Sequence, residues 1–158
     1  MSESEIGILQ KRRIQAEVIG PIYDAMKAEF GAETAQRILG QAIQEAAIAE
    51  GRDFAVRETV PTNLARYAAL QPLWLKGDAL TVEPILDTET ELHYNVTRCR
   101  YAEMYREMGL AEIGHLLSCN RDGSFCTGYD PRIKLTRTQT IMQGASHCDF
   151  RFRLEDEA

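Results

Sequence analysis

The sequence predicts an α+β fold in which a helical N-terminal half packs on a small antiparallel sheet formed by the C-terminal half. Two observations carry this prediction: apolar residues recur with helical spacing through the first half of the chain, and from Asp78 onward they alternate with a period of two. Helices that precede a group of strands are typical of α+β domains rather than of wound α/β sheets. A chain of 158 residues is long enough for one hydrophobic core, so we expect a single domain over residues 1–158.

Two long helices are predicted in the N-terminal half. The first carries apolar residues at intervals of four, namely Ile14, Val18, Ile22, Met26 and Phe30. A second apolar stripe covers residues 38–46, and both stripes are expected to face the core. Gly31 and Gly51 stand where these helices would stop, and a shorter helix is expected over residues 63–75.

The C-terminal half is predicted to supply the sheet. The alternating pattern places strands over residues 80–86, 92–96, 133–142 and 147–154. The first two form a hairpin that turns near Thr88, and Pro84 puts the first strand at an edge or a bulge because proline has no ladder donor. Between the two pairs of strands we expect a helical segment over residues 101–117 that is broken or bent near Gly109.

Composition narrows the range of partners. The net charge of −6 disfavours nucleic acid, because phosphate binding depends on clustered lysines and arginines. Charged residues interrupt every apolar stretch well short of the roughly 20 residues that a membrane helix needs. The acidic first residues do not resemble a signal peptide, so we expect a cytoplasmic protein with a small-molecule partner and with no nucleic-acid or membrane partner. Assembly into homo-oligomers stays open.

Reactive side chains gather in the last 60 residues. The group consists of Cys99, His115, Cys119, Asp122, Cys126, His147, Cys148 and Asp149. In a reducing compartment the cysteines are free thiols that serve as buried apolar groups, metal ligands or nucleophiles. Their intervals of 20, 7 and 22 residues lack the closely spaced pairs of a zinc site, and nucleotide-binding motifs are absent, so we expect neither a metal nor a cofactor.

One candidate grouping lies on the predicted helix before residue 120. His115 and Cys119 are four residues apart, and Asp122 follows at the helix end. A thiol, an imidazole and a carboxylate could converge there and supply a nucleophile with a base beside it. The alternative is that Cys119 packs as an inert core residue while His115 faces solvent.

The remaining two candidate thiols lie on predicted strands. Cys148 shares a strand face with two phenylalanines, so His147 points the other way and a base would have to come from Asp122 or His115. If its strand is regular, Cys99 lies on the same face as the polar residues at 93, 95 and 97. It would then face solvent or a polar pocket. Packing alone, or exposure alone, is the alternative for each thiol.

Five short motifs stand out in the C-terminal part of the chain. They are RCRYAEM at 98–104, EIG at 112–114, CNRD at 119–122, RTQTIM at 137–142 and CDFR at 148–151. Together they resemble the L-2-amino-thiazoline-4-carboxylic acid hydrolase family, whose helical N-terminal part is less distinctive. The resemblance implies one hydrolase-like domain that opens a small cyclic C–N bond of the amidine or amide kind. The family example is a thiazoline ring that yields a carbamoyl-cysteine.

The resemblance also suggests roles within the site. The catalytic candidates are Cys99, Cys119, Asp122 and Cys148, and the substrate-binding candidates are Arg137, Asp149, Arg151 and His115. Either Cys119 or Cys148 would attack the ring, and Asp122 would handle the proton. Either Arg137 or Arg151 would hold a substrate carboxylate. Cys126, expected in a glycine-flanked loop, and His147 lie outside the motifs, and Cys126 is expected to be dispensable.

Two other functions stay open from the sequence. The same cysteine cluster could belong to a module that binds a small ligand or a metal, or that senses redox state. The chain could also be a packing subunit in which all the cysteines are inert.

Overall fold

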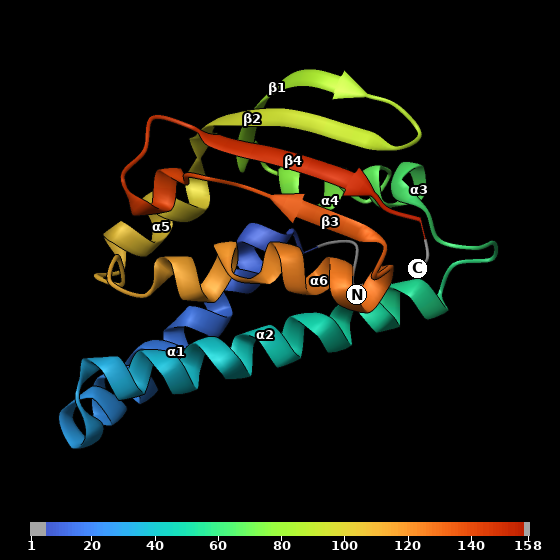
Figure 1. The fold of residues 1–158 in the computed structure, drawn as a ribbon. Coiled ribbons are helices and arrows are strands. Elements are labelled where there is room, and N and C mark those ends of the chain that lie inside the picture. Colours follow the sequence, from blue (N-terminus) through green and yellow to red (C-terminus); the bar gives the residue numbers. More distant parts are fainter. Residues whose placement is uncertain (1–5, 157–158) are drawn as a thin grey trace.

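The computed structural model describes residues 6–156 and confirms the predicted α+β fold, with helices mostly N-terminal and an antiparallel sheet in the C-terminal half (Figure 1). The helices are α1 (Ile8–Phe30), α2 (Ala32–Val56), α3 (Leu64–Ala68), α4 (Pro72–Leu75), α5 (Arg100–Glu107) and α6 (Arg121–Tyr129), with a π-helical turn η2 (His115–Cys119) and a 3-10 turn η3 (Ile141–Gln143). The strands are β1 (Leu80–Asp87), β2 (Glu91–Cys99), β3 (Ile133–Thr136) and β4 (Cys148–Leu154). No helix within residues 6–156 has the length and apolar character needed to cross a membrane.

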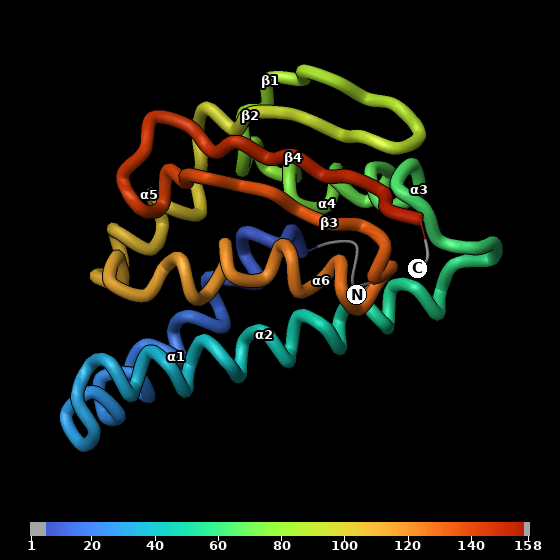
Figure 2. Tube along the Cα trace, viewed as in Figure 1, coloured from blue at the N-terminus to red at the C-terminus, as the bar shows by residue number. Residues whose placement is uncertain are grey.

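The sheet has the order β1-β2-β4-β3 across the described residues, and its neighbouring strands are antiparallel. β4 lies between β2 and β3, as the chain trace shows (Figure 2). β1 is an edge strand and its register shifts just after Pro84, so both expectations for this proline are met. β3 ends at Thr136 and not near residue 142, because the Asp149 carboxylate accepts the backbone N–H groups of Thr138 and Gln139 at 2.9 and 3.0 Å.

Helix α6 lies between the sheet and α2, and α1 crosses α2 obliquely and also contacts α5 and α4 (Figure 1). The α2–α6 crossing is a backbone contact. A Cβ atom on Gly128 would lie 1.9 Å from the Ile48 carbonyl oxygen, and one on Gly51 would lie 2.1 Å from the Phe125 carbonyl oxygen. The prediction that Gly51 ends the second helix was wrong, because α2 continues to Val56 and Gly51 serves this close contact instead. The prediction that Gly31 ends the first helix is confirmed, and Gly31 has a φ of 84°.

The apolar stripe of α1 was predicted to face the core, but most of its side chains are exposed to solvent. Ile14, Val18, Ile22 and Phe30 retain between 48% and 63% of their surface. The buried face is instead the row Ile8, Arg12, Ala16, Gly20 and Tyr23. Small residues in this row allow close packing, and a Cβ on Gly20 would meet Leu110 at 3.3 Å. In the second stripe Leu39 and Ile43 are buried as predicted, but Ile38 is 38% exposed.

The prediction of one helix over residues 63–75 was wrong, whereas the break predicted near Gly109 is confirmed. The segment from residue 63 to 75 forms two short helices, α3 and α4, because Pro72 opens a new helix at its first turn. The helix expected over residues 101–117 is divided: α5 ends at Glu107, and Gly109 takes a φ of 73° that lets the chain turn before η2 begins.

A bulge in β2 overturns the expected facing of Cys99. Thr81 pairs with Arg98 and the next residue, Val82, pairs with Val96, so Thr97 is an unpaired extra residue. Alternation restarts after the bulge, and Cys99 points to the same side as Val96. Cys99 is consequently only 9% exposed and lies in the core, not on the polar face.

The glycine contact between α2 and α6 makes a testable prediction. Gly128→Ala should lower the free energy of unfolding by about 1–3 kcal/mol, because the added methyl group collides with the α2 backbone. The control is Gly123→Ala in the same helix, where a Cβ meets nothing within 4 Å and alanine should stabilise by roughly 0.5–1 kcal/mol. Urea unfolding of both variants measures the difference, and equal stabilities would contradict the packing described.

Candidate functional site

A cavity of about 70 Å³ lies between the inner face of the sheet and the helices, and all four catalytic candidates line it. Its thiol and charged wall residues are Cys99, Cys119, Cys148, Asp122, Arg137, Arg12 and Arg121. Apolar side chains that include Trp74, Val96 and Phe150 complete the wall. A buried water takes up roughly 10–15 Å³ of such space, so the cavity has room for several waters or a small molecule.

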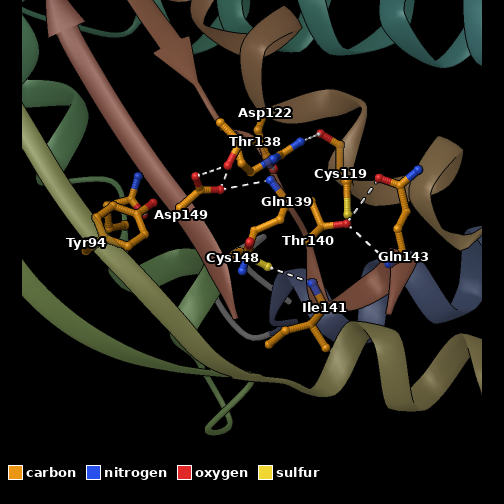
Figure 3. Close-up of polar contacts among 12 residues, drawn as sticks. Tyr94, Cys119, Asp122, Thr138, Gln139, Thr140, Ile141, Gln143, Cys148 and Asp149 are labelled. Carbon is orange, nitrogen blue, oxygen red and sulfur yellow. Dashed lines mark hydrogen bonds and ion pairs between the residues drawn. The ribbon is translucent and has the colours of Figure 1, made fainter. Parts of the chain in front are cut away.

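Cys99 and Cys148 hold their sulfurs in similar hydrogen bonds. Cys99 is the N-cap of α5, and its Sγ accepts the backbone N–H of Ala102 at 3.4 Å. Cys148 opens β4, and its Sγ accepts the backbone N–H of Ile141 at 3.2 Å (Figure 3). The expected face of Cys148, shared with Phe152, is the inner face of the sheet. An N–H donor stabilises a thiolate more than a thiol, so both positions favour ionisation locally.

The π-helical turn η2 determines which groups of its segment reach the cavity. Asn120 donates its backbone N–H to the His115 carbonyl at 2.9 Å, five residues back. Ser118 and Cys119 both line the cavity, whereas His115 is not among its lining residues. The predicted convergence of imidazole and thiol is therefore absent from the cavity wall. The Asn120 side chain also donates to the Gly40 carbonyl at 3.0 Å, which ties the end of η2 to α2.

Arg137 and Asp122 form an ion pair at the cavity wall. The Arg137 guanidinium donates to Asp122 Oδ2 at 2.6 Å and to the Cys119 carbonyl at 3.0 Å, and it lies 4.9 Å from the centre of the Phe150 ring. Burial raises the pKa of Asp122 even though Arg137 opposes the shift. Burial also lowers the pKa of Arg137, but the Asp122 charge outweighs it and the net shift is upward. Asp122 therefore takes up a proton at a higher pH than an ordinary aspartate does.

Burial dominates the ionisation of the cavity thiols. It raises the pKa of Cys99 to about 11, despite the N–H of Ala102. It also raises the pKa of Cys119, and the nearby Asp122 charge adds to that shift. The pKa of Cys148 is raised by burial too, while the Ile141 N–H and the Arg137 charge oppose the shift. At neutral pH these groups are therefore thiols and not thiolates.

Three predicted substrate-binding residues lie away from the cavity. Asp149 and Arg151 occupy the opposite face of β4 from Cys148, as strand parity predicts. The Arg151 guanidinium donates to the carbonyls of Tyr94 and Phe150 at 3.0 and 2.8 Å and to Asn95 Oδ1 at 3.0 Å. His115, as noted above, is the third.

Cys126 is not in a loop. It lies inside α6, is fully buried, and is not a lining residue of the cavity. The glycines at 123 and 128 that suggested a loop are both helical.

Sequence reasoning missed a second group of charged residues. Arg12 and Arg121 line the cavity and are 3% and 8% exposed, and Glu50 lies against both. The useful signal for Arg12 was its place four residues before Ala16 in a row of small residues. For Arg121 the signal was membership of the CNRD motif.

Among residues 6–156 no three side chains of His, Cys, Asp or Glu come close enough to hold one metal ion together.

Known proteins resemble this chain at two levels. Among solved structures, the phenol-responsive sensory domain of the transcription activator PoxR, crystallised with phenol, has the same fold, with a TM-score of 0.55. The two chains are 10% identical, and the comparison covers 87% of this chain and 73% of that one. No curated protein matches the sequence. Residues 11–152, which include every thiol and charged residue of the cavity wall, match the family described as L-2-amino-thiazoline-4-carboxylic acid hydrolase, and the chain belongs to this family.

Proposed function

We propose that the chain is a single-domain hydrolase that opens a small cyclic C–N bond of the amidine or amide kind. The observation that carries the proposal is the convergence of Cys99, Cys119, Cys148 and Asp122, from separate elements, on one cavity. Family membership supports the same chemistry, with a thiazoline carboxylate as its example. The cavity volume of about 70 Å³ suits a small molecule and not a peptide or a polymer.

Neutral thiols suit this substrate class. An amidine nitrogen is basic, so a thiol can give its proton to the ring nitrogen as sulfur bonds to the adjacent ring carbon. A protonated amidine already carries one proton on its ring nitrogen, so the thiol proton is the second and lets that nitrogen leave as an amine when the ring C–N bond breaks. The ring carbon stays attached to the cysteine sulfur. Water then attacks this carbon and gives a proton to Asp122, which passes it to the sulfur as the bond between carbon and cysteine breaks. The remaining hydroxyl proton goes to the released amine, and the carbon leaves as a carbonyl.

Cys148 is the better candidate for the nucleophile. Its sulfur accepts the Ile141 N–H at 3.2 Å, and the positive charge of Arg137 lies near enough to favour the thiolate. Cys119 has no such N–H donor among the described hydrogen bonds. Arg137 and Asp122 act in opposite directions on both thiols, but Asp122 has the larger effect at Cys119 and Arg137 the larger effect at Cys148. Asp122 itself serves as the base for water, because burial raises its pKa toward the range in which a carboxylate exchanges protons.

A small-ligand sensor is the second candidate function. Two observations favour it: the cavity holds thiols and not thiolates, and the PoxR sensory domain, which shares the fold, responds to phenol. In a sensor the cavity would bind its ligand without turnover. One fold can serve both roles, so the chemistry of the wall residues decides between them.

Turnover of L-2-aminothiazoline-4-carboxylate tests the hydrolase. The wild-type protein should open the ring, and Cys148→Ala and Asp122→Asn should each lower kcat by about 10²-fold or more, since each removes a proton-transfer or bond-forming group. Cys126→Ala is the matched control, because Cys126 is also a buried thiol but lies outside the cavity. Its folded protein should keep wild-type kcat. Saturable binding of this compound with no turnover would favour the sensor.

The pH dependence of thiol alkylation tests the electrostatics. With a pKa of about 11, Cys99 should react with iodoacetamide slowly at pH 7 and about tenfold faster for each added pH unit up to pH 10. Mass spectrometry of timed samples locates the modified residue. A rate that levels off below pH 8 would show that the thiolate is already formed at neutral pH.

The raised pKa of Cys99 also makes the free energy of unfolding depend on pH. An unfolded cysteine ionises near pH 8.5, whereas the folded Cys99 resists ionisation until about pH 11. The stability linked to the neutral thiol is therefore present below about pH 8.5 and declines as the pH rises toward 11. Urea unfolding at pH 7.5 and pH 10 should show this loss, and Cys99→Ala should reduce it.

A further inference from the structure

Two buried arginines and one partly buried glutamate meet where α1, α2 and α6 come together. The Arg12 Nη2 and Arg121 Nη1 atoms lie 3.8 and 3.4 Å from the same Glu50 oxygen, Oε2. All three residues line a space of about 40 Å³ that shares Arg12, Arg121 and Asp122 with the thiol cavity. The cluster therefore forms one end of the candidate site and not a separate feature of the core.

The cluster has more donors than acceptors. A guanidinium group has five N–H donors. Within residues 6–156, Arg12 gives one hydrogen bond, to Gln15 Oε1 at 3.1 Å, and Arg121 gives two, to the Leu117 carbonyl at 2.9 Å and to Glu50 at 3.4 Å. Two positive charges face one carboxylate, which leaves a net positive charge in a buried place. Burial, and after it the charge of Arg12, lowers the pKa of Arg121 to about 10.

Glu50 is itself incompletely paired. Its second oxygen, Oε1, is buried and accepts no hydrogen bond from the described residues, with only Lys11 Nζ nearby at 4.0 Å. Leaving a buried carboxylate oxygen without a donor is unfavourable. Glu50 is thus a loosely held counter-ion that another anion could replace.

A surface groove reaches the same cluster from outside. Its charged lining residues are four basic ones, Lys11, Arg57, Lys76 and Arg121, and two acidic ones, Glu50 and Asp53. The cluster therefore stands between this groove and the thiol cavity. Basic residues outnumber acidic ones in the lining, and an excess of positive charge favours the approach of an anion.

We propose that Arg12 and Arg121 together bind the carboxylate of a small acid, which replaces Glu50 as their counter-ion. Two guanidinium groups from different helices can each donate to one carboxylate, a strong and directional arrangement. The two residues named earlier for this role are engaged elsewhere, since Arg137 pairs with Asp122 and Arg151 lies on the outer face of the sheet. As a step in hydrolysis this inference rests on the proposed function, but the binding site itself does not.

Thermal-shift titration of the full chain with L-2-aminothiazoline-4-carboxylate and its methyl ester tests the inference. The wild-type protein should bind the acid about ten- to a hundredfold more tightly than the ester, because the ester cannot accept charged hydrogen bonds. Arg12→Lys and Arg121→Lys should remove most of that preference, since an ammonium cannot replace the guanidinium fork. Glu50→Gln should strengthen acid binding, because it removes the competing carboxylate.

Arg13→Lys is the matched control for these variants. Arg13 is adjacent to Arg12, half exposed and paired with Glu17, so its replacement should leave the preference for the acid unchanged. Equal binding of acid and ester by the wild-type protein overturns the inference, and so does the absence of binding by either. The comparison of acid with ester uses only the wild-type protein, so it does not depend on whether the variants fold.

The two proposals fail separately. Acid binding that depends on Arg12 and Arg121, without any turnover, would support the anion site and overturn the hydrolase. Turnover with a KM that is the same in wild type, Arg12→Lys and Arg121→Lys would support the hydrolase and overturn the anion site.

Discussion

Helix α6 can lie between α2 and the sheet only because Gly51 and Gly128 let the two helix backbones touch. That contact sets the depth at which the start of α6 meets the inner face of β4. Asp122 then faces the strand that carries Cys148, and Arg121 faces Glu50 on α2. The charged and thiol groups of the cavity are thus positioned by two residues that have no side chains. Side-chain chemistry at the site depends on backbone packing about one to two helical turns away.

The described cavity combines opposing electrostatic effects. Burial keeps the thiols neutral, while backbone N–H groups favour charge at Cys99 and Cys148 and Arg137 favours it at Cys119 and Cys148. Asp122 is likewise pulled toward the neutral form by burial and toward the charged form by Arg137. Such a site changes its protonation when a ligand brings its own charge or basic nitrogen. This property is compatible with both proposed functions, a hydrolase and a small-ligand sensor, and a shared fold does not decide between them.

Sequence patterns predicted the sheet better than they predicted the helix faces. The period of two and Pro84 located the hairpin and its edge strand, because each strand has one buried face and the ladder excludes proline. On α1 the same kind of argument failed, since Arg12, Ala16 and Gly20 face the core where close helix contacts and a buried ion cluster need small or charged residues. Cys119, Asp122 and Cys148 could be grouped from sequence motifs. Arg12 was not grouped with them, because its one signal, the small residues Ala16 and Gly20 that follow it at helical spacing, does not by itself mark a charged side chain as buried.

The extra residue in β2 has a consequence for the comparison of related chains. Thr97 and Arg98 both point outward, and alternation resumes so that Cys99 faces inward after Val96. A chain one residue shorter at this point would form a regular ladder and still present the same thiol to the cavity. In an alignment it would show a gap at Thr97 beside an unchanged cysteine. Strand length can therefore drift by one residue here during evolution while the site stays intact.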